Sequence, residues 1–392
     1  TAIGSESLYS NSTAAHNCAV GYKALYTVTV NGDNTAVGNY ALTTSTAPRN
    51  VALGYTAMYA TTTGSDNCAL GTASLRFNTT GTSNIAVGGE ALRSNTTGAS
   101  NTAVGKGALF NNTTTSQNTA VGSGALYSSN TGDNVAIGYN SAYNQTTGSN
   151  TTAIGRNALA ECTTGIQNVA VGNYTLDAVT TGEYNSGMGY LCLSGVTTGS
   201  RNVAIGRSSG STTTAGNFNC FFGYNSRADN ASGDYTNTFG YNIIGSAGYT
   251  TIGRSSVDIR ALHGNATWAT VSDERYKKDI EHSTAGLNFV NDLKPRTFNY
   301  RNKGDLPTTF KAYEKDSTTP YKNSETNHGF IAQEVKEAID AHPDIKDGFK
   351  MWDIREDGSQ EVSEAAVIPI LVKAIQELSA KVNELENKLQ GN

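Results

Sequence analysis

Small apolar residues recur at a fixed spacing over the first two-thirds of the chain. The motif N-x-A-[VIL]-G-x-x-A-L is clearest at 17–25, 34–42, 84–92, 101–109 and 118–126, for example as NCAVGYKAL and NTAVGNYAL. Its glycine returns about every 17 residues, with rare slips of one residue, which predicts stacked copies of one structural unit. The motif glycines are Gly4, Gly21, Gly38, Gly54, Gly71, Gly88, Gly105, Gly122, Gly138, Gly155, Gly172, Gly189, Gly206, Gly223 and Gly240.

Each repeat predicts two short strands joined by a turn. The Thr-Ala-Val stretch alternates and favours a strand, and the glycine supplies unusual backbone angles or a close backbone approach. The Ala-Leu pair is expected to start a second strand, and a T-T-G segment such as Thr147-Gly148 returns the chain to the next rung. Because the inward residues (Ala, Val and Leu) are small, we expect a slender solenoid of about fifteen rungs, roughly 70 Å long. Disorder, which the low-complexity composition alone would indicate, would not keep the apolar residues in register.

Polar and aromatic residues add two details to the solenoid. Thr and Asn are expected to form stacked ladders between rungs. From Asn217 to residue 271 the repeat loosens and aromatic residues accumulate, which indicates either a wider core that caps the solenoid and tightens a trimer, or a glycan-binding surface. Packing is favoured, because stacked aromatic side chains more often pack than bind. These residues are Phe218, Phe221, Phe222, Tyr224, Tyr235, Phe239, Tyr241 and Tyr249. We therefore divide this part into a shaft, residues 1–216, and a distal cap, residues 217–271.

The end of the chain has a seven-residue period. A coiled-coil helix is predicted for residues 367–390, with Lys381 and Glu386 at flanking sites suited to an interchain pair. Branched residues at the first core position with Leu at the second favour a dimer in an isolated coiled coil. The first core position holds Ile368, Ile375, Val382 and Leu389, and the second holds Leu371, Leu378 and Leu385. Before it, residues 328–331 predict a strand, and residues 332–341 predict a helix that ends at His342-Pro343.

Charge divides the chain at residue 272. The repeats are nearly uncharged, whereas Lys, Arg, Asp and Glu are frequent from Ser272 onward, where the net charge of −5 mainly arises. This change indicates a domain boundary. The modest negative charge argues against nucleic-acid binding, no run approaches the roughly 20 apolar residues of a membrane span, and no signal peptide is visible. Thr1 begins in the middle of the repeating pattern, so we expect a fragment of a longer protein.

The cysteines predict no metal or cofactor site. None forms a C-x-x-C pair or has a histidine at metal-ligand spacing. Cys18, Cys68 and Cys220 share a repeat position that elsewhere holds Thr, Val or Ile. We expect them to fill small buried slots rather than to form disulfides. The other two cysteines are Cys162 and Cys192.

The repeat resembles the N-x-A-I-G-x-x-A/S motif in the β-roll heads of trimeric autotransporter adhesins, and also repeats of phage fibres. The resemblance covers roughly Thr1 to Gly253 and implies parallel β-rolls packed as trimers. The unit here is longer than the typical adhesin repeat. A bacterial adhesin should end in a membrane-spanning barrel segment, which the charged heptad tail does not fit.

The segment W-A-T-V-S-D-E-R-Y-K-K-D-I, residues 268–280, resembles the start of the intramolecular chaperone domain of phage endosialidases, tail spikes and neck appendages. L-K-P-R-T-F-N-Y (293–300), H-G-F-I-A-Q-E-V (328–335) and V-I-P-I-L-V-K-A-I-Q-E-L (367–378) follow in the same order. The resemblance covers residues 272–392. It implies a domain that trimerises, helps the preceding fibre to fold, and then cuts itself off before the Ser of S-D-x-R-x-K.

Carried over to this sequence, the cleaved bond lies between Val271 and Ser272. Ser272 matches the essential serine of the family and Lys277 its lysine partner, while Asp273 and Arg275 match the same motif in supporting roles. A hydroxyl nucleophile needs a base, and a neutral lysine can serve when burial or neighbouring cations lower its pKa. Attack on the preceding carbonyl and attack across subunits are both open.

The same residues also fit a structural role. Ser-Asp-Glu-Arg before an apolar residue is typical of a helix cap. On one ideal helix, Ser272 and Lys277 would lie about 140° apart, so the catalytic pair requires another local conformation or another assembly.

These patterns together predict a mostly β protein: a trimeric parallel β-roll or β-solenoid fibre, followed by a smaller α+β chaperone domain that ends in a coiled-coil helix. The predicted function is a bacteriophage tail fibre or spike that folds in the host cytoplasm, joins other tail proteins of the virion and binds a host-surface glycan or protein. Its chemistry is one self-cleavage. The alternatives are a bacterial adhesin head and a glycan-degrading spike. The latter needs a carboxylate pair, whereas Asp33, Asp66 and Asp133 recur at one loop position.

Overall fold

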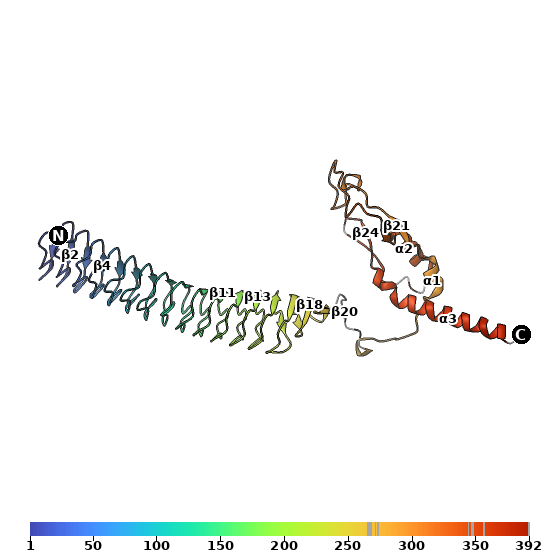
Figure 1. The fold of residues 1–392 in the computed structure, drawn as a ribbon, viewed down its shortest axis with the longest axis horizontal. Helices are drawn as coiled ribbons and strands as arrows, with labels where there is room; N and C mark the ends of the chain where they lie inside the picture. The colour runs from blue at the N-terminus through green and yellow to red at the C-terminus, as the bar shows by residue number, and fades with distance from the viewer. Residues whose placement is uncertain are drawn as a thin grey trace. The chain divides into compact units, whose positions relative to one another are not determined.

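The chain forms two compact units, Thr1–Ser272 and Asp273–Asn392. The first is a parallel β-solenoid, and the second is a small α+β unit that ends in a long helix, so the mostly β fold class is confirmed (Figure 1). The computed structural model describes residues 1–264, 269–270, 272, 274–343, 345, 349–355 and 357–390.

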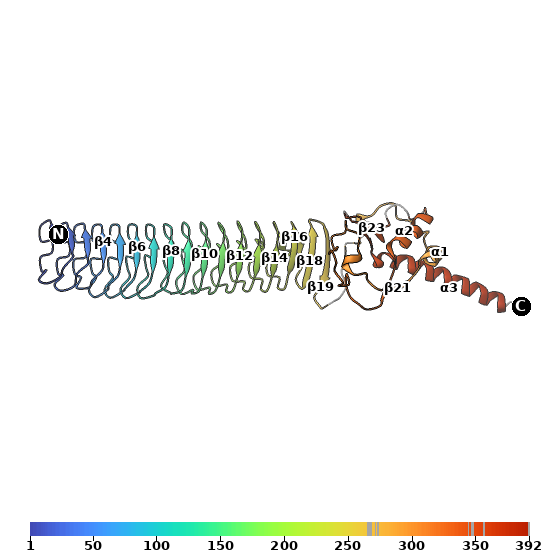
Figure 2. The ribbon, with the colours of Figure 1, turned by 90° about the horizontal axis from the view of Figure 1, so that it is seen from above.

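Each rung of the solenoid contributes one short strand to an 18-stranded sheet, and the strands stack along the rod (Figure 2). Neighbouring strands pair in parallel with the repeat in register, so that Ala103 lies opposite Ala120 and Val104 opposite Val121. The parallel strands are β1 Ala2–Ile3, β2 Cys18–Val20, β3 Thr35–Val37, β4 Val51–Leu53, β5 Cys68–Leu70, β6 Ile85–Val87, β7 Thr102–Val104, β8 Thr119–Val121, β9 Val135–Ile137, β10 Thr152–Ile154, β11 Val169–Val171, β12 Ser186–Met188, β13 Val203–Ile205, β14 Cys220–Phe222, β16 Asn237–Tyr241 and β18 Tyr249–Arg254.

The core of the solenoid is narrower than the sequence predicts. The central alanine of each strand, such as Ala103, is fully buried, and so is the leucine of the Ala-Leu pair, such as Leu109. The third strand residue, such as Val104, is only half-buried. Successive residues of a strand point to opposite sides, so a central inward alanine turns both of its neighbours outward. The prediction that the motif valine faces inward is therefore wrong.

The predicted second strand at the Ala-Leu pair is also wrong. The residues after each glycine form turns, in which Lys23 (φ 54°) and Leu25 (φ 51°) have left-handed backbone angles. The N–H of Lys23 donates to Ser5 of the rung before (3.1 Å), whereas the N–H of Leu25 donates to Ala41 of the rung after (3.1 Å). Because left-handed residues interrupt the extended chain, the segment curves and places both Ala24 and Leu25 in the core.

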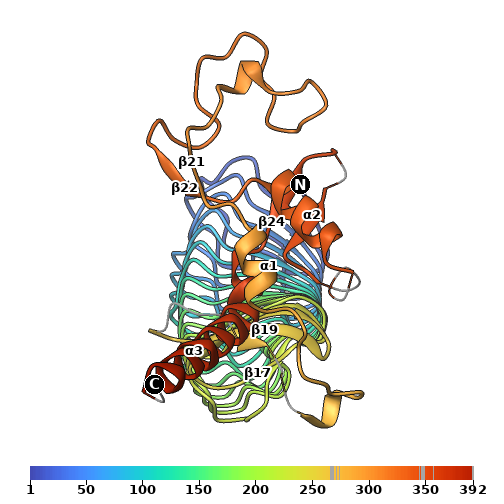
Figure 3. The same ribbon diagram turned by 90° about the vertical axis from the view of Figure 1, so that its right-hand side faces the viewer.

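The motif glycine allows the rungs to approach closely, as predicted. Gly105 has φ +130°, and a Cβ atom there would lie 2.5 Å from the carbonyl carbon and oxygen of Gly122 in the next rung. Only glycine combines this backbone conformation with this contact. Seen along the rod in Figure 3, the rungs lie one behind another with little offset.

Asparagine and threonine form the expected ladders. The Asn84 side chain donates to the Oδ1 of Asn67 (3.1 Å), and that of Asn101 donates to the Oδ1 of Asn84 (3.1 Å). These asparagines are fully or almost fully buried. The Thr79 hydroxyl donates to the carbonyl oxygen of Thr96 at 3.0 Å. The side-chain amides and hydroxyls thus provide hydrogen-bond partners for polar groups inside the rod. Without such partners, these groups would be costly to bury.

An antiparallel hairpin ends the stack. Strand β18 pairs in parallel with β16 and antiparallel with β19 (Val257–Leu262), which in turn pairs with β20 (Ala269–Thr270). A separate small sheet joins β15 (Arg227–Ala228) to β17 (Ile244–Gly245). The direction of the strands is therefore reversed at this end of the rod.

Most aromatic residues of the distal cap lie outside the core of the chain. Phe218, Tyr224, Tyr235 and Tyr241 are exposed, because they stand in the loops or at outward-facing strand positions. Phe221 stands where most rungs have the central alanine and is fully buried, so an aromatic ring fills the core in this rung. The prediction of an aromatic core therefore holds for Phe221 and is wrong for the exposed rings.

The cysteines divide into two groups. Cys18, Cys68 and Cys220 begin strands and are only half-buried, so the prediction that they fill buried slots is wrong. The first strand residue points away from the core, as the third does. Cys162 and Cys192 are fully buried, and burial raises their pKa values to about 11 and about 12. All five lie in the described residues and are free thiols.

The second unit packs short elements around one core. Phe289 and Met351 are completely buried at its centre, together with Val335 and Ile370. The prediction of a helix at residues 332–341 is confirmed by α2. The elements are η1 Glu274–Tyr276, α1 Leu287–Asp292, β21 Arg296–Phe298, η2 Lys303–Asp305, β22 Asn327–Gly329, α2 Ala332–Ala341, β23 Trp352–Ile354, β24 Gln360–Val362, η3 Glu364–Val367 and α3 Ile368–Gln390, where η denotes a 3-10 helix.

Helix α3 has two different faces. Ile370 and Ala374 are buried against the unit, and the Glu377 carboxylate accepts a hydrogen bond from the N–H of Leu287 (2.9 Å), at the start of α1. The heptad residues lie on the exposed side: Ile375 is 66% exposed and Leu389 79%. The predicted helix is therefore present, with its apolar heptad stripe in solvent. Among the described helices, none is long and apolar enough to cross a membrane.

Candidate self-cleavage site

The predicted catalytic residues stand at the junction of the two units. Ser272 is the last residue of the first unit and is exposed, whereas Lys277 and Arg275 belong to the second and are also exposed. The structure does not group Ser272 with Lys277 in one compact unit. Val271 and Asp273 lie outside the described residues.

The segment around Lys277 is not an α-helix. Glu274–Tyr276 form a single 3-10 turn, and the N–H of Lys277 donates to the carbonyl oxygen of Glu274 at 2.9 Å. Asp279 then has a left-handed backbone (φ 53°), and no α-helix begins among the described residues before Leu287. The separation of about 140° that an ideal helix would impose on Ser272 and Lys277 therefore does not apply.

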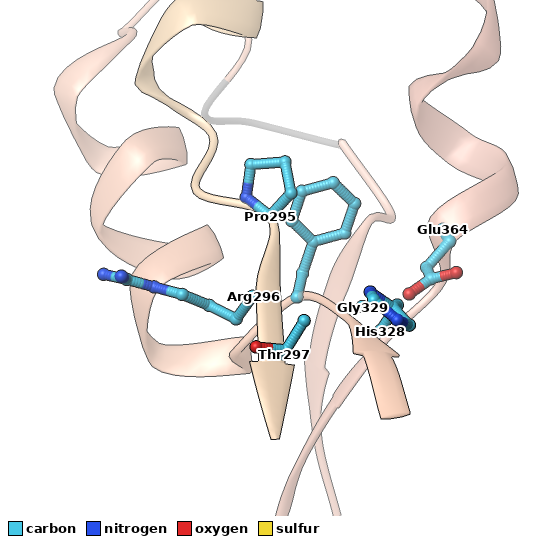
Figure 4. Close-up of a pocket in the computed structure, with 7 residues that line it drawn as sticks. Pro295, Arg296, Thr297, His328, Gly329 and Glu364 are labelled. Atoms are coloured by element: carbon cyan, nitrogen blue, oxygen red, sulfur yellow. The ribbon is translucent and has the colours of Figure 1, made fainter. Parts of the chain in front are cut away.

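Two of the motif segments pack together beside a cavity. Strands β21 and β22 pair antiparallel, with Arg296 opposite Gly329 and Thr297 opposite His328. The cavity next to them has a volume of about 540 Å³ (Figure 4). It is lined by Pro295, Arg296, Thr297, His328, Gly329, Phe330 and Glu364.

Glycine at position 329 leaves room for the acid of this cavity. A Cβ atom on Gly329 would lie 3.0 Å from Oε1 of Glu364, so a side chain there would crowd the carboxylate. Figure 4 shows Glu364 close to His328 and Gly329. Sequence reasoning missed this arrangement, because the lining residues are spread from Pro295 to Glu364 and share no spacing pattern.

Arg296 connects the two motif segments. Its Nε donates to Oε2 of Glu334 at 3.0 Å and its Nη2 donates to Oε1 at 2.6 Å, so the pair is bidentate. The hydrogen bonds and charge of Arg296 lower the pKa of Glu334. In Figure 4 the Arg296 side chain extends away from Glu364. The Arg296 guanidinium therefore links β21 to α2 and points away from the cavity.

A larger groove of about 960 Å³ adjoins the cavity and shares His328, Gly329 and Glu364 with it. Asp357 fixes the loop that borders the groove: it accepts hydrogen bonds from the N–H of Lys311 (3.1 Å) and from the hydroxyl of Ser359 (2.6 Å). The Ser359 hydroxyl, then the backbone N–H groups, lower the pKa of Asp357 to about 2. An ionised Asp357 therefore joins Lys311 and Ser359 at the border of the groove.

The remaining candidate groups have structural positions. His342 lies 2.7 Å from Asp292 through Nε2 and Oδ2, and its ring meets Phe289 edge-on. In the repeats, Asp66 is exposed and paired with Arg49, whose hydrogen bond lowers the pKa of the acid to about 2. Within the described part of the chain, no group of three His, Cys, Asp or Glu side chains could hold a metal ion.

Comparison with known proteins gives one family. Residues 272–342 match the peptidase S74 model, described as chaperone of endosialidase. The match begins at Ser272, includes β21, β22 and α2, and ends one residue after α2. No curated protein and no solved structure matches the chain. Residues 272–342 are therefore similar to a chaperone-of-endosialidase domain.

Proposed function

We propose that the chain is the distal part of a trimeric bacteriophage tail fibre or spike, whose second unit assists folding and is then released by cleavage between Val271 and Ser272. The observation that carries this proposal is the start of the family match at Ser272, at the boundary of the two compact units. A cut there would separate the rod from its helper unit and leave both cores intact.

The cleavage requires one nucleophile and one base. The Ser272 hydroxyl attacks the carbonyl carbon of Val271, and Lys277 accepts the hydroxyl proton. The bond from this carbon to the nitrogen of Ser272 breaks, the proton passes to that nitrogen, and an ester joins Val271 to the serine oxygen. Water then hydrolyses the ester, which yields a carboxylate on Val271 and restores the hydroxyl. In this scheme Asp273 and Arg275 support the geometry of the pair.

Exposure of Lys277 links this chemistry to assembly. A lysine serves as a base only when it is neutral, and burial is one way to favour the neutral form. Lys277 is exposed in the single chain. We expect association of the chains to supply the missing burial, so cleavage follows assembly.

Two exposed apolar surfaces support self-association. The first is the heptad stripe of α3. The second is an apolar column along the sheet, formed by exposed and half-buried residues that lie opposite one another in successive strands: Ile3, Val20, Val37, Leu53, Leu70, Val87, Val104, Val121, Ile137, Ile154, Val171, Met188, Ile205, Phe222, Phe239 and Ile252. Sixteen strands that are about 4.8 Å apart and about 10 Å long give the strand face that carries this column an area of roughly 770 Å² per chain. That area is close to the roughly 800 Å² that each partner buries in a stable interface, and large for an exposed apolar patch.

The trimeric state follows from the family resemblance rather than from the heptads. The heptad residues alone favour a dimer, but the fibre and the chaperone unit would impose their own stoichiometry on α3. In this proposal the assembled fibre belongs to the virion, contacts a glycan or protein of the host surface, and is held by other tail proteins.

Mass spectrometry of the full expressed chain tests the cleavage. We expect two products, one that ends at Val271 and one that begins at Ser272. Ser272→Ala and Lys277→Ala should each leave the chain intact. Lys315→Ala is the matched control, because it removes an exposed lysine of the second unit that is distant in sequence from the proposed pair, and it should be cleaved. Complete cleavage of Ser272→Ala would refute the mechanism.

Mixed assemblies distinguish the two routes of attack. Ser272→Ala and Lys277→Ala chains with different tags are expressed together. If the lysine acts across subunits, the Lys277→Ala chain is cleaved, since it keeps its own serine and can use the lysine of its neighbour. If both residues act within one chain, neither variant is cleaved.

A further inference from the structure

Two columns of aromatic and arginine side chains flank the sheet over its last rungs. The first column, two residues before each strand, contains Tyr184, Arg201, Phe218 and Tyr235. The second column, two residues after each member of the apolar column, contains Tyr190, Arg207, Tyr224, Tyr241 and Arg254. We call these the distal columns. Farther up the rod, the first-column positions hold no Tyr, Phe or Trp, and the second-column positions hold Tyr22, Tyr55, Tyr139 and Arg156 among small or polar residues such as Ser123.

The first column is a continuous stack. The guanidinium of Arg201 lies 5.1 Å from the ring centre of Tyr184 and 5.3 Å from that of Phe218. The rings of Phe218 and Tyr235 are nearly parallel (5°), with centres 5.1 Å apart. Tyr235 remains 54% exposed. The stack is therefore ordered before anything binds to it.

The second column repeats this arrangement on the other side of the strands. Arg207 lies 5.8 Å from the ring centre of Tyr190 and 5.6 Å from that of Tyr224. Tyr224 and Tyr241 stack with centres 5.2 Å apart, and Arg254 lies 6.0 Å from the Tyr241 ring centre. Between the two columns, Phe222 and Phe239 stack at 5.4 Å in the apolar column of the sheet.

The chemistry of these columns fits a protein partner better than a sugar. A ring inside a stack has its faces covered by its neighbours, so those faces are not available to a sugar ring. Tyr, Phe and Arg that are held rigidly are typical of the residues that dominate protein interfaces, and the distal columns contain no Lys, Asp or Glu. An arginine that is already held between two rings has fewer side-chain conformations to lose. Its conformational entropy therefore decreases less when a partner binds.

The repetitive strand face of the shaft does not by itself define the axial alignment of two copies. Its rungs are nearly identical on the strand face, as in NTAVGKGAL and NTAVGSGAL. Two such faces could therefore pair one rung out of register at little cost, because a slip by a whole repeat meets an equivalent surface. Only the last rungs combine both columns with the Phe222–Phe239 pair, so a slipped pairing would leave this combination without its counterpart.

We propose that the rungs from β12 to β18 anchor self-association, and that the distal columns pack against further copies of this chain and fix their axial register. The inference rests on the proposed self-association. The shafts of the copies then associate from the anchored end, along the apolar column of each chain. The occupant is a second copy because the distal columns flank the apolar column of the proposed self-association surface, over rungs that every copy carries.

The test compares two variants of the full chain. The anchor variant carries Arg207→Ser, Phe222→Val and Phe239→Val, which are residue types that the shaft has at these positions in Ser123 and Val121. The matched control is Arg156→Ser. Arg156 occupies the same repeat position as Arg207 and also lies between two rings, 5.9 Å from Tyr139 and 5.6 Å from Tyr174.

Two measurements are read on each protein. Sedimentation equilibrium gives the dissociation constant of the assembly, which should rise at least tenfold in the anchor variant and less than threefold in the control. A photo-cross-linking amino acid at the exposed Lys106, followed by peptide mass spectrometry, gives the register. The wild type should cross-link within one rung, whereas the anchor variant should add cross-links displaced by one repeat, about 17 residues.

Each outcome has a definite meaning. A monomeric wild type refutes the proposed self-association itself. An assembled wild type with equal affinity and register in both variants overturns the anchor and leaves the proposed function intact. If the triple variant loses its β-sheet circular dichroism, Arg207→Ser alone, which keeps both phenylalanines, is compared with Arg156→Ser by the same criteria.

Discussion

Replacing Gly105 by alanine should break the stack locally. The new Cβ would lie 2.5 Å from the carbonyl carbon and oxygen of Gly122, and its backbone would keep φ near +130°. The strained backbone costs about 1–3 kcal/mol, and forcing atoms into a packed region costs about 1–3 kcal/mol more. The sum, about 2–6 kcal/mol, should fall on the adjacent rungs, because each rung of a solenoid contacts mainly its neighbours.

Hydrogen exchange measured by mass spectrometry reports this loss rung by rung. Since about 1.4 kcal/mol corresponds to a factor of ten, amides of residues 84–126 should exchange at least roughly 25-fold faster in Gly105→Ala. Gly89→Ala is the matched control, because a Cβ atom added to Gly89 would have no other atom within 4 Å. If both variants exchange at the same rate, the close approach of the glycines is not what limits the rung spacing.

Three further predictions concern the core, an acid and the thiols. Leu109→Ala removes a fully buried side chain and should cost about 2–5 kcal/mol in local opening free energy, whereas an unchanged exchange rate in its rung would contradict the burial. The pKa of Asp357 is about 2 when folded and 3.8 ordinarily, so its stabilisation is present above pH 4 and is lost as the pH falls towards 2. The urea midpoint of the second unit should therefore decrease over this interval, and less so in Asp357→Asn. Burial raises the pKa of Cys162 and Cys192, so iodoacetamide at pH 8 should modify the half-buried Cys18 first, as peptide mass spectrometry can show.

The period of the sequence was sufficient to predict the register of the sheet. A glycine every 17 residues can stack only on the next glycine, and Asn84 can then meet only Asn67 and Asn101. These features follow from the repeat alone, because each rung has the same neighbours.

The path of the chain inside one rung was not predictable in this way. Leucine rarely adopts a left-handed backbone, yet Leu25 does so because its N–H must reach Ala41 while its side chain enters the core. The backbone conformation of Leu25 is therefore determined by the neighbouring rungs and not by the conformational preference of leucine.

The candidate site shows the same contrast. Ser272 and Lys277 could be identified from a local motif, but that motif does not specify the geometry of the pair, because the two residues belong to different compact units. The cavity beside Glu364 depends on Gly329, which is 35 positions earlier in the chain. Distant packing of this kind leaves no local pattern to read.

The antiparallel hairpin that closes the rod has a consequence for its length. An open parallel edge is a template on which further chains can add end to end, as in amyloid filaments. Strand β19 runs against β18, and β20 pairs with the other edge of β19, so the edge of the last parallel rung is already covered and no rung of another molecule can add to it. Rungs of other molecules therefore cannot add at this end. The length of the rod is set by the number of repeats in the sequence, at about 4.8 Å each.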